Sequence, residues 1–212
     1  MQKFLPIFPL NMVAFPGEQL KLHIFEPRYR ELINECESTG KTFGLPVVYK
    51  SEIMEYGTEM ELVRIYKKYE TGEMDIEVRG IQVFRVLEVI EVVPEKLYSG
   101  AIVAMVNDIQ DHHGKLLLEF TELTQKLFTL LDIEDDIRKR SLTMRSFSLG
   151  HYVGMDLIDE YEILKHPRET TRQKIIVEHI KKILPGVQQI AEIREKAKLN
   201  GHFRMVNPPE GL

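Results

Sequence analysis

The hydrophobic period of this chain changes once, near Gly114. Before this point apolar residues alternate with polar ones, as in Leu20, Leu22 and Ile24, which is typical of strands with one buried face. After it they recur every three or four residues, which is typical of amphipathic helices. Strands followed by helices predict an α+β fold. The expected boundaries are 1–107 for a strand-rich subdomain, 115–200 for a helical bundle and 201–212 for a tail.

One helix is expected inside the strand half, at about residues 27–38. Glu26 can cap this helix, and Pro27 suits its first turn, where a missing N–H costs nothing. Gly40 can supply the left-handed residue after its end. The side chains spaced i, i+3, i+4 and i+7 predict one buried stripe: Tyr29, Leu32, Ile33 and Cys36. Cys36 is therefore expected to be a small core residue and not a nucleophile.

Prolines and glycines indicate where the remaining segments bend, bulge or begin. Pro46, within the apolar segment 43–49, predicts a sheet edge or a bulge. Gly80, within the long strand-like segment 75–93, predicts a bulge or a sharp bend. Four segments of the second half have a helical period: 116–130, 142–153, 156–164 and 168–184. Pro185 is expected to begin a fifth helix that runs to about residue 199.

The composition is that of a folded globular protein. Of 212 residues, 43% are hydrophobic and 29% are charged, which excludes a chain that is disordered throughout. No segment reaches the ~18 uninterrupted apolar residues of a membrane-spanning helix, and Pro6 and Pro9 interrupt any signal-peptide helix. Cys36 is the one cysteine, so no intrachain disulfide can form, in keeping with a reducing compartment. We therefore expect a cytoplasmic protein with no membrane partner.

Charge is distributed unevenly along the chain. The net charge is −5, whereas proteins that bind nucleic acid usually carry a basic surplus. Residues 165–200 nevertheless hold nine Lys and Arg against four Glu, a local surplus of +5. A solvated helix face is the favoured interpretation of this segment, and a surface that steers a partner is the alternative. Nucleic acid is therefore disfavoured as a partner without being excluded.

The sequence contains none of the common catalytic motifs. The phosphate-binding loop, the dinucleotide fingerprint, the nucleophile elbow and the H-E-x-x-H zinc motif are all missing. We therefore predict no catalytic residue and no cofactor. One weak candidate for a metal site precedes Gly114, where Asp108, Asp111, His112 and His113 offer carboxylate and imidazole groups. A polar loop between subdomains is the favoured interpretation, because adjacent histidines point in different directions in most backbones.

Several segments together resemble the LON substrate-binding domain, which is the N-terminal domain of Lon proteases. The most specific are LPIFPL at 5–10 and VRGIQVFRVLEV at 78–89, and the segment VAFPGEQLKLHIFEPRYREL at 13–32 also carries the resemblance. Two shorter segments add to them, FGLPVV at 43–48 and YGTEMELV at 56–63. In the helical half, SFSLGHYVGMDLIDEYEILKH at 146–166 resembles a helix pair of the family more loosely. The resemblance covers about residues 4–184.

The resemblance implies both a fold and a function. The fold is a β-rich, PUA-like pseudo-barrel followed by a C-terminal helical bundle. The function is recognition of unfolded or exposed apolar polypeptide segments, with a protease or a chaperone as a further candidate partner. Full Lon proteases continue into an ATPase module and a Ser-Lys peptidase module. This chain is similar to the stand-alone members, so the resemblance implies a binding module and no enzyme activity.

A physical mechanism for such binding can be proposed from the residues. An open or bulged sheet edge near Pro46 would accept an extended peptide by backbone pairing. Phe15, Met54 and Met60 would add weak, sequence-tolerant apolar contacts. Scattered methionines are also common as gap-fillers in a core, which is the alternative interpretation.

Two other function classes stay open at this stage. PUA-like barrels also occur in RNA-modifying systems, and the basic segment 165–200 keeps an RNA-binding function in view. A small enzyme with an unrecognised site is the third hypothesis, and a deep pocket lined by convergent polar groups would favour it. The oligomeric state and the identity of bound proteins are not predicted.

Overall fold

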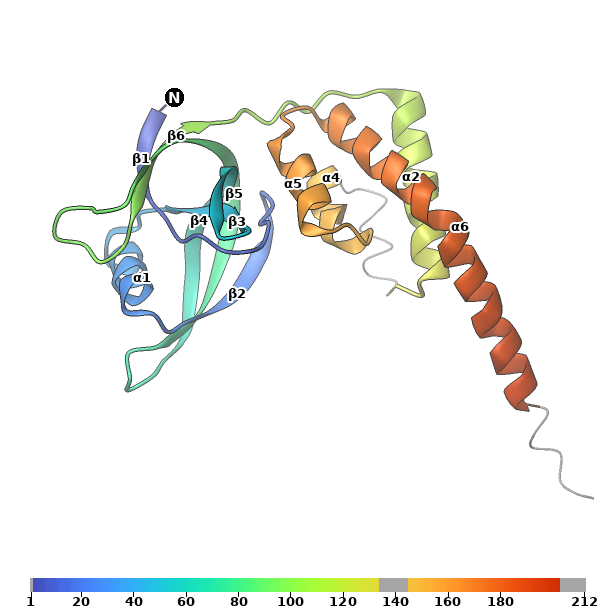
Figure 1. The fold of residues 1–212 in the computed structure, drawn as a ribbon, viewed down its shortest axis with the longest axis horizontal. Helices are drawn as coiled ribbons and strands as arrows, with labels where there is room; N and C mark the ends of the chain where they lie inside the picture. The colour runs from blue at the N-terminus through green and yellow to red at the C-terminus, as the bar shows by residue number, and fades with distance from the viewer. Residues whose placement is uncertain (1, 134–144, 203–212) are drawn as a thin grey trace, which may run out of the picture.

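The computed structural model describes residues 2–133 and 145–202. Within them, strands and one helix form the first half, and helices form the second (Figure 1). The strands are β1 (Gln2–Pro6), β2 (Gln19–Ile24), β3 (Phe43–Tyr49), β4 (Glu52–Lys68), β5 (Met74–Ile90) and β6 (Gly100–Met105). The helices are α1 (Pro27–Thr39), α2 (Gly114–Leu130), α4 (Ser146–Leu149), α5 (Leu157–Lys165) and α6 (Glu169–His202), with a 3-10 turn at Gly150–Tyr152. This order confirms the predicted α+β class.

The strands form one antiparallel sheet that closes on itself. Its order is β1-β6-β5-β4-β3, and β2 is added beside β5. The chain that follows β1, Ile7–Leu10, runs back in parallel beside β3. Phe8 N–H donates to Gly44 O at 2.8 Å, and Val48 N–H donates to Leu10 O at 2.8 Å. These bonds close the outer edge of β3, so the expected barrel-like form of the strand half is present.

The sheet bends at the positions where the sequence predicts irregularity. The register of β3 and β4 shifts between Pro46 and Val48. The register of β4 and β5 shifts where Gly80 and Gln82 lie opposite consecutive residues of β4. The bulges predicted at Pro46 and Gly80 are therefore confirmed. A bulge increases local twist, which helps a sheet of this length to curl.

A second glycine allows a close backbone approach between β3 and β4. Gly57 of β4 pairs with Pro46 of β3. A Cβ added at Gly57 would lie 2.5 Å from Leu45 O and 2.7 Å from the Phe84 ring. Only glycine fits this space, so β3 and β4 can pack against the Phe84 ring without a void.

Helix α1 packs its predicted stripe against the sheet. Tyr29, Leu32, Ile33 and Cys36 are all buried in the same apolar cluster. Gly40 ends the helix with φ 69°, and its N–H donates to Cys36 O at 2.9 Å. Burial raises the pKa of the Cys36 thiol to about 11, so the thiolate is scarce near neutral pH. Its predicted role as a core residue is confirmed.

Glu26 occupies the capping position of α1, but its side chain does not cap the helix. It makes no hydrogen bond to a backbone N–H of the first turn. It accepts instead from Arg28 Nε at 2.9 Å. The carboxylate thus compensates a cation that the helix dipole disfavours in the first turn.

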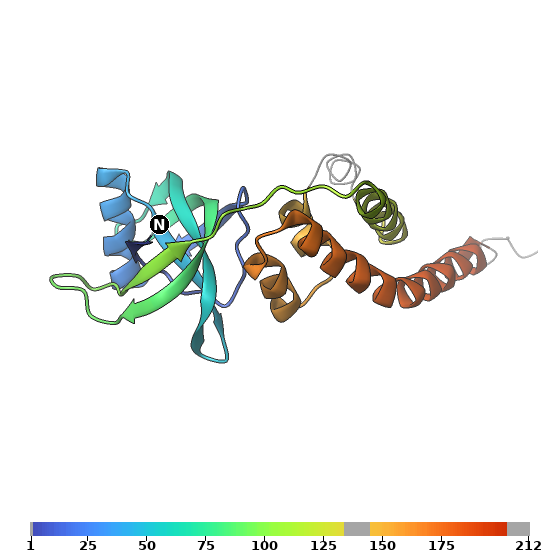
Figure 2. The same ribbon diagram turned by 90° about the horizontal axis from the view of Figure 1, so that it is seen from above.

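The helical half differs from the prediction in two places. The helix expected at 142–153 is a short α4 and a 3-10 turn, and residues 134–144 lie outside the described part of the chain. The prediction that Pro185 begins a new helix is wrong, because α6 continues through it. Pro185 leaves the carbonyl of Lys181 without its helical donor, but both residues are exposed, so water can satisfy that carbonyl. Figure 2 shows the axis of α6 changing direction along its length.

The two halves share one core. Phe15 and Val83 of the strand half belong to the same buried cluster as Phe147, Ile163 and Ile176 of the helical half. The rings of Phe15 and Phe147 stack with centroids 5.5 Å apart. Helices α4 and α5 lie between the sheet and the pair formed by α2 and α6 (Figure 1). Among the helices described, none is both long and apolar enough to cross a membrane.

Candidate functional site

The four residues expected to contact a polypeptide do not form a common surface. Phe15 and Met60 are each 0% exposed and belong to different buried clusters. Pro46 is buried within β3, and Met54 is partly buried against the shared core. The expectation that Phe15 and Met60 present their side chains to a partner is wrong for this structure, because both fill the interior. Core packing is the role that the alternative interpretation gave to the methionines.

The sheet edge expected to be open near Pro46 is occupied. Pro46 has no N–H, but its carbonyl accepts from Leu10 N–H at 3.3 Å. Leu10 lies in the segment that closes the sheet, and its own carbonyl accepts from Val48. The bulge at this position is real and the open edge is not, because the chain covers it with its own earlier residues.

An open edge lies instead at β2, which like the end strand β1 pairs with one strand only among the described residues. In the described part of the chain this strand pairs only with β5, from Gln19 opposite Arg79 to Ile24 opposite Met74. Gly80 N–H donates to Glu18 O at 2.9 Å, which fixes the alternation of hydrogen bonds along the pair. Every second residue after Glu18, namely Leu20, Leu22 and Ile24, therefore directs its backbone N–H and C=O toward β5. The N–H and C=O groups of the intervening residues, Gln19, Lys21 and His23, therefore face away from the sheet.

The two faces of β2 differ in character. Leu20 and Leu22 are partly buried and extend the apolar cluster that includes α1. Gln19, Lys21 and His23 are exposed on the opposite face. A strand laid beside β2 would continue both faces, one apolar and one charged.

Two hollows flank this edge. The first, of about 390 Å³, lies where β2 begins, at the junction with the helical half. Its lining includes Glu18 and Gln19 on one side and Phe147, His151 and Tyr152 on the other. The second, of about 410 Å³, lies further along the strand, where Lys21, His23, Tyr66 and Asp75 are among its lining residues. Side chains of an added strand would therefore find space at both ends of β2.

His151 ties the start of β2 to the helical half. Its ring nitrogens lie 3.1 Å from Glu18 Oε2 and 2.7 Å from Glu160 Oε1. Burial alone lowers the pKa of His151, but the hydrogen bonds and charges of the two glutamates outweigh it and raise the pKa to about 10. The imidazolium is therefore the form present near neutral pH, and it bridges two carboxylates from different halves of the molecule.

Most charges beside the edge are already paired. His23 Nδ1 lies 2.7 Å from Asp75 Oδ1, and Tyr69 O–H donates to Asp75 Oδ2 at 2.7 Å. The Tyr69 bond and then the His23 bond hold the pKa of Asp75 below its usual value. Arg64 Nε donates to Glu77 Oε2 at 2.6 Å. Lys21 differs from these groups, because no carboxylate of the described residues lies within ion-pair distance of it.

The weak metal candidates lie elsewhere and have other contacts. His113 Nδ1 accepts from Leu116 N–H at 3.3 Å and so caps α2. Asp111 accepts from the N–H and hydroxyl of Thr170 and from Arg168, and the Thr170 N–H contributes most to lowering its pKa to about 2. Asp111, His112 and His113 all line one hollow of about 730 Å³ between α2 and α6, separate from the two hollows beside β2. Within residues 2–133 and 145–202, no group of three or more such side chains is placed to hold a metal ion.

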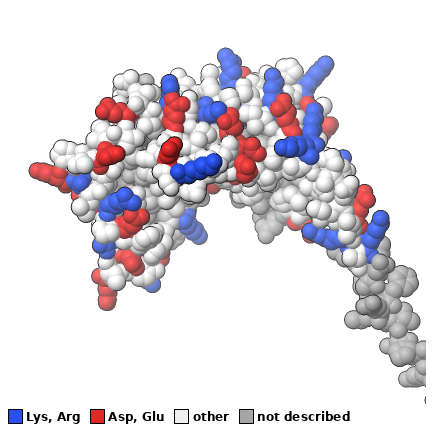
Figure 3. Space-filling view, in the orientation of Figure 1, with Lys and Arg blue, Asp and Glu red and all other residues white. Residues whose placement is uncertain are grey.

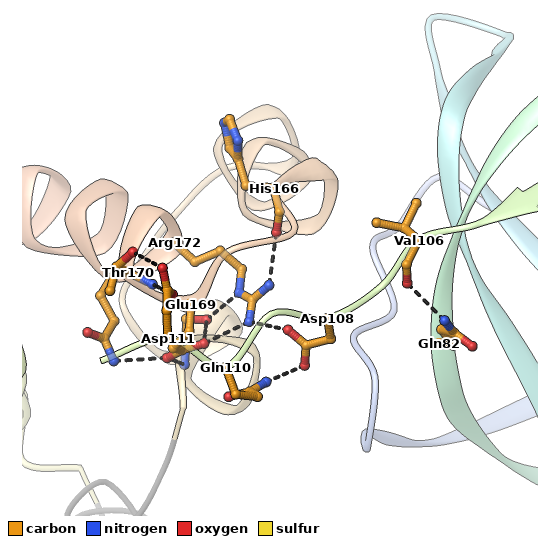
Figure 4. A network of polar contacts seen from close by, with 11 residues as sticks. Gln82, Val106, Asp108, Gln110, Asp111, His166, Glu169, Thr170 and Arg172 are labelled. Carbon is orange, nitrogen blue, oxygen red and sulfur yellow. Dashed lines mark hydrogen bonds and ion pairs between the residues drawn. The ribbon is translucent and has the colours of Figure 1, made fainter. Parts of the chain in front are cut away.

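Asp108 belongs to a polar network centred on the buried Arg172 (Figure 4). The fully buried guanidinium donates to Asp108 at 2.7 Å, Glu169 at 2.8 Å, the Ser146 hydroxyl at 2.8 Å and the His166 carbonyl at 2.9 Å. Burial alone raises the pKa of Glu169, but donors from Ser146 and Arg172 hold it below its usual value. These contacts join the segment after β6 to α4 and α6, so they position the helical half and form no reactive centre.

Four of the nine cations of the basic segment have local carboxylate partners. Lys165 pairs with Glu162, Arg168 with Asp111, Arg172 with Glu169 and Lys181 with Glu119. On the face that Figure 3 shows, blue and red side chains are interspersed and form no single basic surface. This distribution favours the solvated helix face over a surface for nucleic acid.

Comparison with known proteins decides the family. The model of the ATP-dependent protease La (LON) substrate-binding domain matches residues 4–185. The chain belongs to the LON substrate-binding domain family. The match spans both the closed sheet and most of the helical half, so the resemblance found in the sequence is confirmed. It also covers β2 and both hollows beside it.

Solved structures and a curated relative agree with membership of the LON family. The Lon N-terminal domain protein from Xanthomonas campestris is 20% identical, with a TM-score of 0.61 over 83% of this chain and 98% of that one. The N-terminal domain of the Mycobacterium avium complex Lon protease is 11% identical, with a TM-score of 0.69 over 84% of this chain and 98% of that one. At these identities the likeness establishes the fold of the LON domain alone.

The curated relative is a much longer protein. It is a LON peptidase N-terminal domain and RING finger protein from Schizosaccharomyces pombe, 28% identical over 106 residues. The matched part is 41% of this chain, and it spans only 21% of that protein. The similarity therefore concerns the LON domain and not the activity of the whole relative.

The open edge of β2 was missed by sequence reasoning. The alternation in Gln19–Ile24 identified a strand but not its neighbours. One local signal was present: β2 is followed by a helix and not by a hairpin turn, so no sequence-adjacent strand covers it. That signal distinguishes β2 from β4 and β5, which are joined by the turn at Thr71-Gly72.

Proposed function

We propose that this LON domain is a non-catalytic module that binds extended segments of unfolded polypeptides along the open edge of β2. The observation that carries the proposal is that Gln19, Lys21 and His23 turn unpaired backbone N–H and C=O groups away from the sheet. An extended chain offers complementary backbone groups whatever its sequence, so pairing of this kind suits diverse substrates. The family description, a substrate-binding domain, supports the same class of function.

The expected affinity is modest. Each backbone hydrogen bond contributes a net ~1 kcal/mol, and three edge residues limit the number of bonds to a few. Part of this gain is offset by the entropy lost when a disordered segment becomes ordered. Side chains that enter the two hollows, of about 390 and 410 Å³, must supply the rest. Weak, sequence-tolerant binding is what a module that samples many unfolded chains requires.

No catalytic role is part of this proposal. The polar clusters described above are satisfied by internal partners, and the largest of them holds helices together. RNA binding is not carried forward as a second function, because four of the nine cations of the basic segment pair with neighbouring carboxylates and the face in Figure 3 shows no single basic surface.

The test is binding of a fluorescently labelled, reduced and alkylated model protein that stays unfolded, followed by anisotropy. Lys21→Pro removes the central edge N–H, and because that N–H is not used in pairing with β5, the variant should still fold. Lys21→Ala is its matched control, since it removes the same side chain and keeps the N–H. We expect Lys21→Pro to bind at least about tenfold more weakly than Lys21→Ala, because one hydrogen bond is lost and the ring obstructs the added strand.

Circular dichroism and thermal unfolding of both variants establish that they are folded. Equal binding by the two variants would contradict backbone pairing at β2. Absence of binding by the unaltered protein at ~100 μM, a free energy weaker than about 5.5 kcal/mol, would contradict the polypeptide-binding function itself.

A further inference from the structure

We propose that the β2 edge selects extended segments in which an acidic residue is flanked by apolar residues, with the acidic side chain opposite Lys21. This inference rests on the proposed function, and it adds the chemistry of the segment that binds best. It follows from how the two faces of β2 meet an incoming strand and from the one cation on the edge that has no ion-pair partner.

The positions of the incoming side chains follow from the backbone geometry. A strand that pairs with the outward N–H and C=O of Lys21 places one residue directly opposite it. Residues directly opposite share a face of the sheet, so that residue lies beside the Lys21 side chain. Its two neighbours point to the other face, next to Leu20 and Leu22.

The inner face favours apolar neighbours. Leu20 and Leu22 are only partly buried, and they pack on a cluster that includes the half-buried Leu10 and Met12. Apolar side chains added beside them would remove further apolar surface from water, at roughly 25 cal/mol per Å². Polar residues at those positions would lose hydration without gaining a partner.

The outer face favours an acidic residue on the added strand, because Lys21 is the cation of this edge that has no ion-pair partner among the described residues. The opposite residue on β5 is Glu77, but its carboxylate already accepts from Arg64 at 2.6 Å and from the Tyr66 hydroxyl at 2.8 Å. Asp75 is engaged by His23 and Tyr69. Lys21 itself makes only longer-range interactions: its Nζ lies 5.5 Å from the centroid of the Tyr66 ring, and its charge adds, after the bonds from Tyr66 and Arg64, to the lowering of the Glu77 pKa. A carboxylate on an added strand would meet this ammonium group without displacing an existing bond.

The same geometry disfavours a second copy of this chain as the occupant. Two β2 strands paired in antiparallel fashion about their centres would place Lys21 against Lys21. Like charges directly opposite one another are destabilising in a sheet. A foreign segment with an acidic centre has no such penalty.

The test uses three fluorescein-labelled, end-blocked peptides. The first, Ser-Val-Thr-Val-Glu-Val-Thr-Val-Ser, places valines on one face and glutamate at the centre of the other. The second carries lysine in place of the glutamate. The third, Val-Val-Val-Val-Glu-Ser-Thr-Thr-Ser, has the composition of the first without its alternation. We expect the first to bind about tenfold more tightly than either of the others, and the preference over the second to shrink in 0.5 M salt.

Two charge-reversal variants locate the effect. Lys21→Glu should reverse the order of affinity, so that the lysine peptide binds more tightly than the glutamate peptide. Lys126→Glu changes the net charge equally at an exposed position of α2, away from the edge, and should leave the order unchanged. Sedimentation of the unaltered protein gives its oligomeric state in the same buffer.

The outcomes separate this inference from the function on which it rests. If the unfolded model protein binds and Lys21→Pro weakens it, but the glutamate and lysine peptides bind equally, charge selection is overturned and polypeptide binding stands. If Lys126→Glu reversed the order of peptide affinities as Lys21→Glu does, charge selection at β2 would also be overturned, because the preference would then reflect the net charge of the protein. If neither the peptides nor the unfolded protein bind, and Lys21→Pro dissociates a dimer, the occupant is a second copy and both proposals fail.

Discussion

Two edge strands of the sheet, β3 and β2, differ in what lies beside their outer edges. β3 carries a proline, the residue that usually accompanies an unpaired edge, and yet its outer side is closed by Ile7–Leu10. β2 carries no proline and has no strand beyond it in the described residues. Proline removes a donor but keeps its carbonyl acceptor, and Pro46 uses that acceptor to bind Leu10. A proline therefore indicates where an N–H is dispensable, and it does not indicate that an edge is free.

Amide hydrogen exchange should give the largest difference between the two edges. The Val48 amide, bonded to Leu10 O, is expected to exchange about a thousandfold more slowly than in an unfolded chain. The Lys21 amide, which faces away from β5, should exchange within about tenfold of the unfolded rate. Exchange measured residue by residue by NMR checks this. Strong protection of Lys21 in the isolated protein would mean that the edge is already covered.

Gly57→Ala should damage the closed edge severely. The added Cβ would lie 2.5 Å from Leu45 O, and backbone cannot move aside as a flexible side chain can. We expect the free energy of unfolding to fall by about 3 kcal/mol, measured by urea denaturation. Gly186→Ala is the control, because a Cβ there has nothing within 4 Å and alanine suits a helix. A loss below about 1 kcal/mol for Gly57→Ala would show that β3 and β4 are less tightly joined than described.

His151→Gln should loosen the anchored end of the open edge, and the effect should depend on pH. The pKa of His151 is raised to about 10 in the folded protein, above its ordinary value near 6.5, so its protonation stabilises the fold. That contribution is complete below about pH 6.5 and declines as the pH rises through about 10. We expect a loss of about 2 kcal/mol at pH 6 and a much smaller loss at pH 10.5. Urea denaturation at pH 6, 8 and 10.5 measures it, and a loss independent of pH would contradict the ionic bridge.

Gly17→Ala should have the smallest effect. Gly17 precedes β2 with φ 84°, and an added Cβ would have nothing within 4 Å. The cost is then conformational strain alone, about 1 kcal/mol for an alanine in the left-handed region. Thermal unfolding measures the loss, and peptide binding should be unchanged because the edge groups of β2 keep their positions. A loss as large as that of Gly57→Ala would mean that the start of β2 is as tightly packed as the closed edge.

Local features of the fold were predictable because local rules govern them. The stripe Tyr29, Leu32, Ile33 and Cys36 follows from helical period, and the turn after α1 follows from the freedom of Gly40. The bulge at Pro46 follows from its missing donor. Pro185 was predicted wrongly because the local rule omits exposure: water can replace the lost hydrogen bond on the outer side of α6.

The candidate site was not predictable in the same way. Phe15 and Met60 are apolar, as residues of a polypeptide-binding surface would be. Only the packing of distant residues places them in the interior. Phe15, for example, is covered by Phe147, more than a hundred residues later in the chain. Whether a side chain of this kind is core or surface depends on what folds over it, which no local pattern contains.

The sequence by itself determined the class of the fold, most of its elements and the family, because period, turn residues and motif segments are properties of neighbouring residues. The tertiary structure alone decided that the outer edge of β3 is closed and that of β2 is open. That choice depends on non-local hydrogen bonds: residues 7–10 happen to return beside β3, and no described strand returns beside β2. An unpaired backbone group looks the same in sequence as a paired one, so only the path of the chain in space distinguishes them.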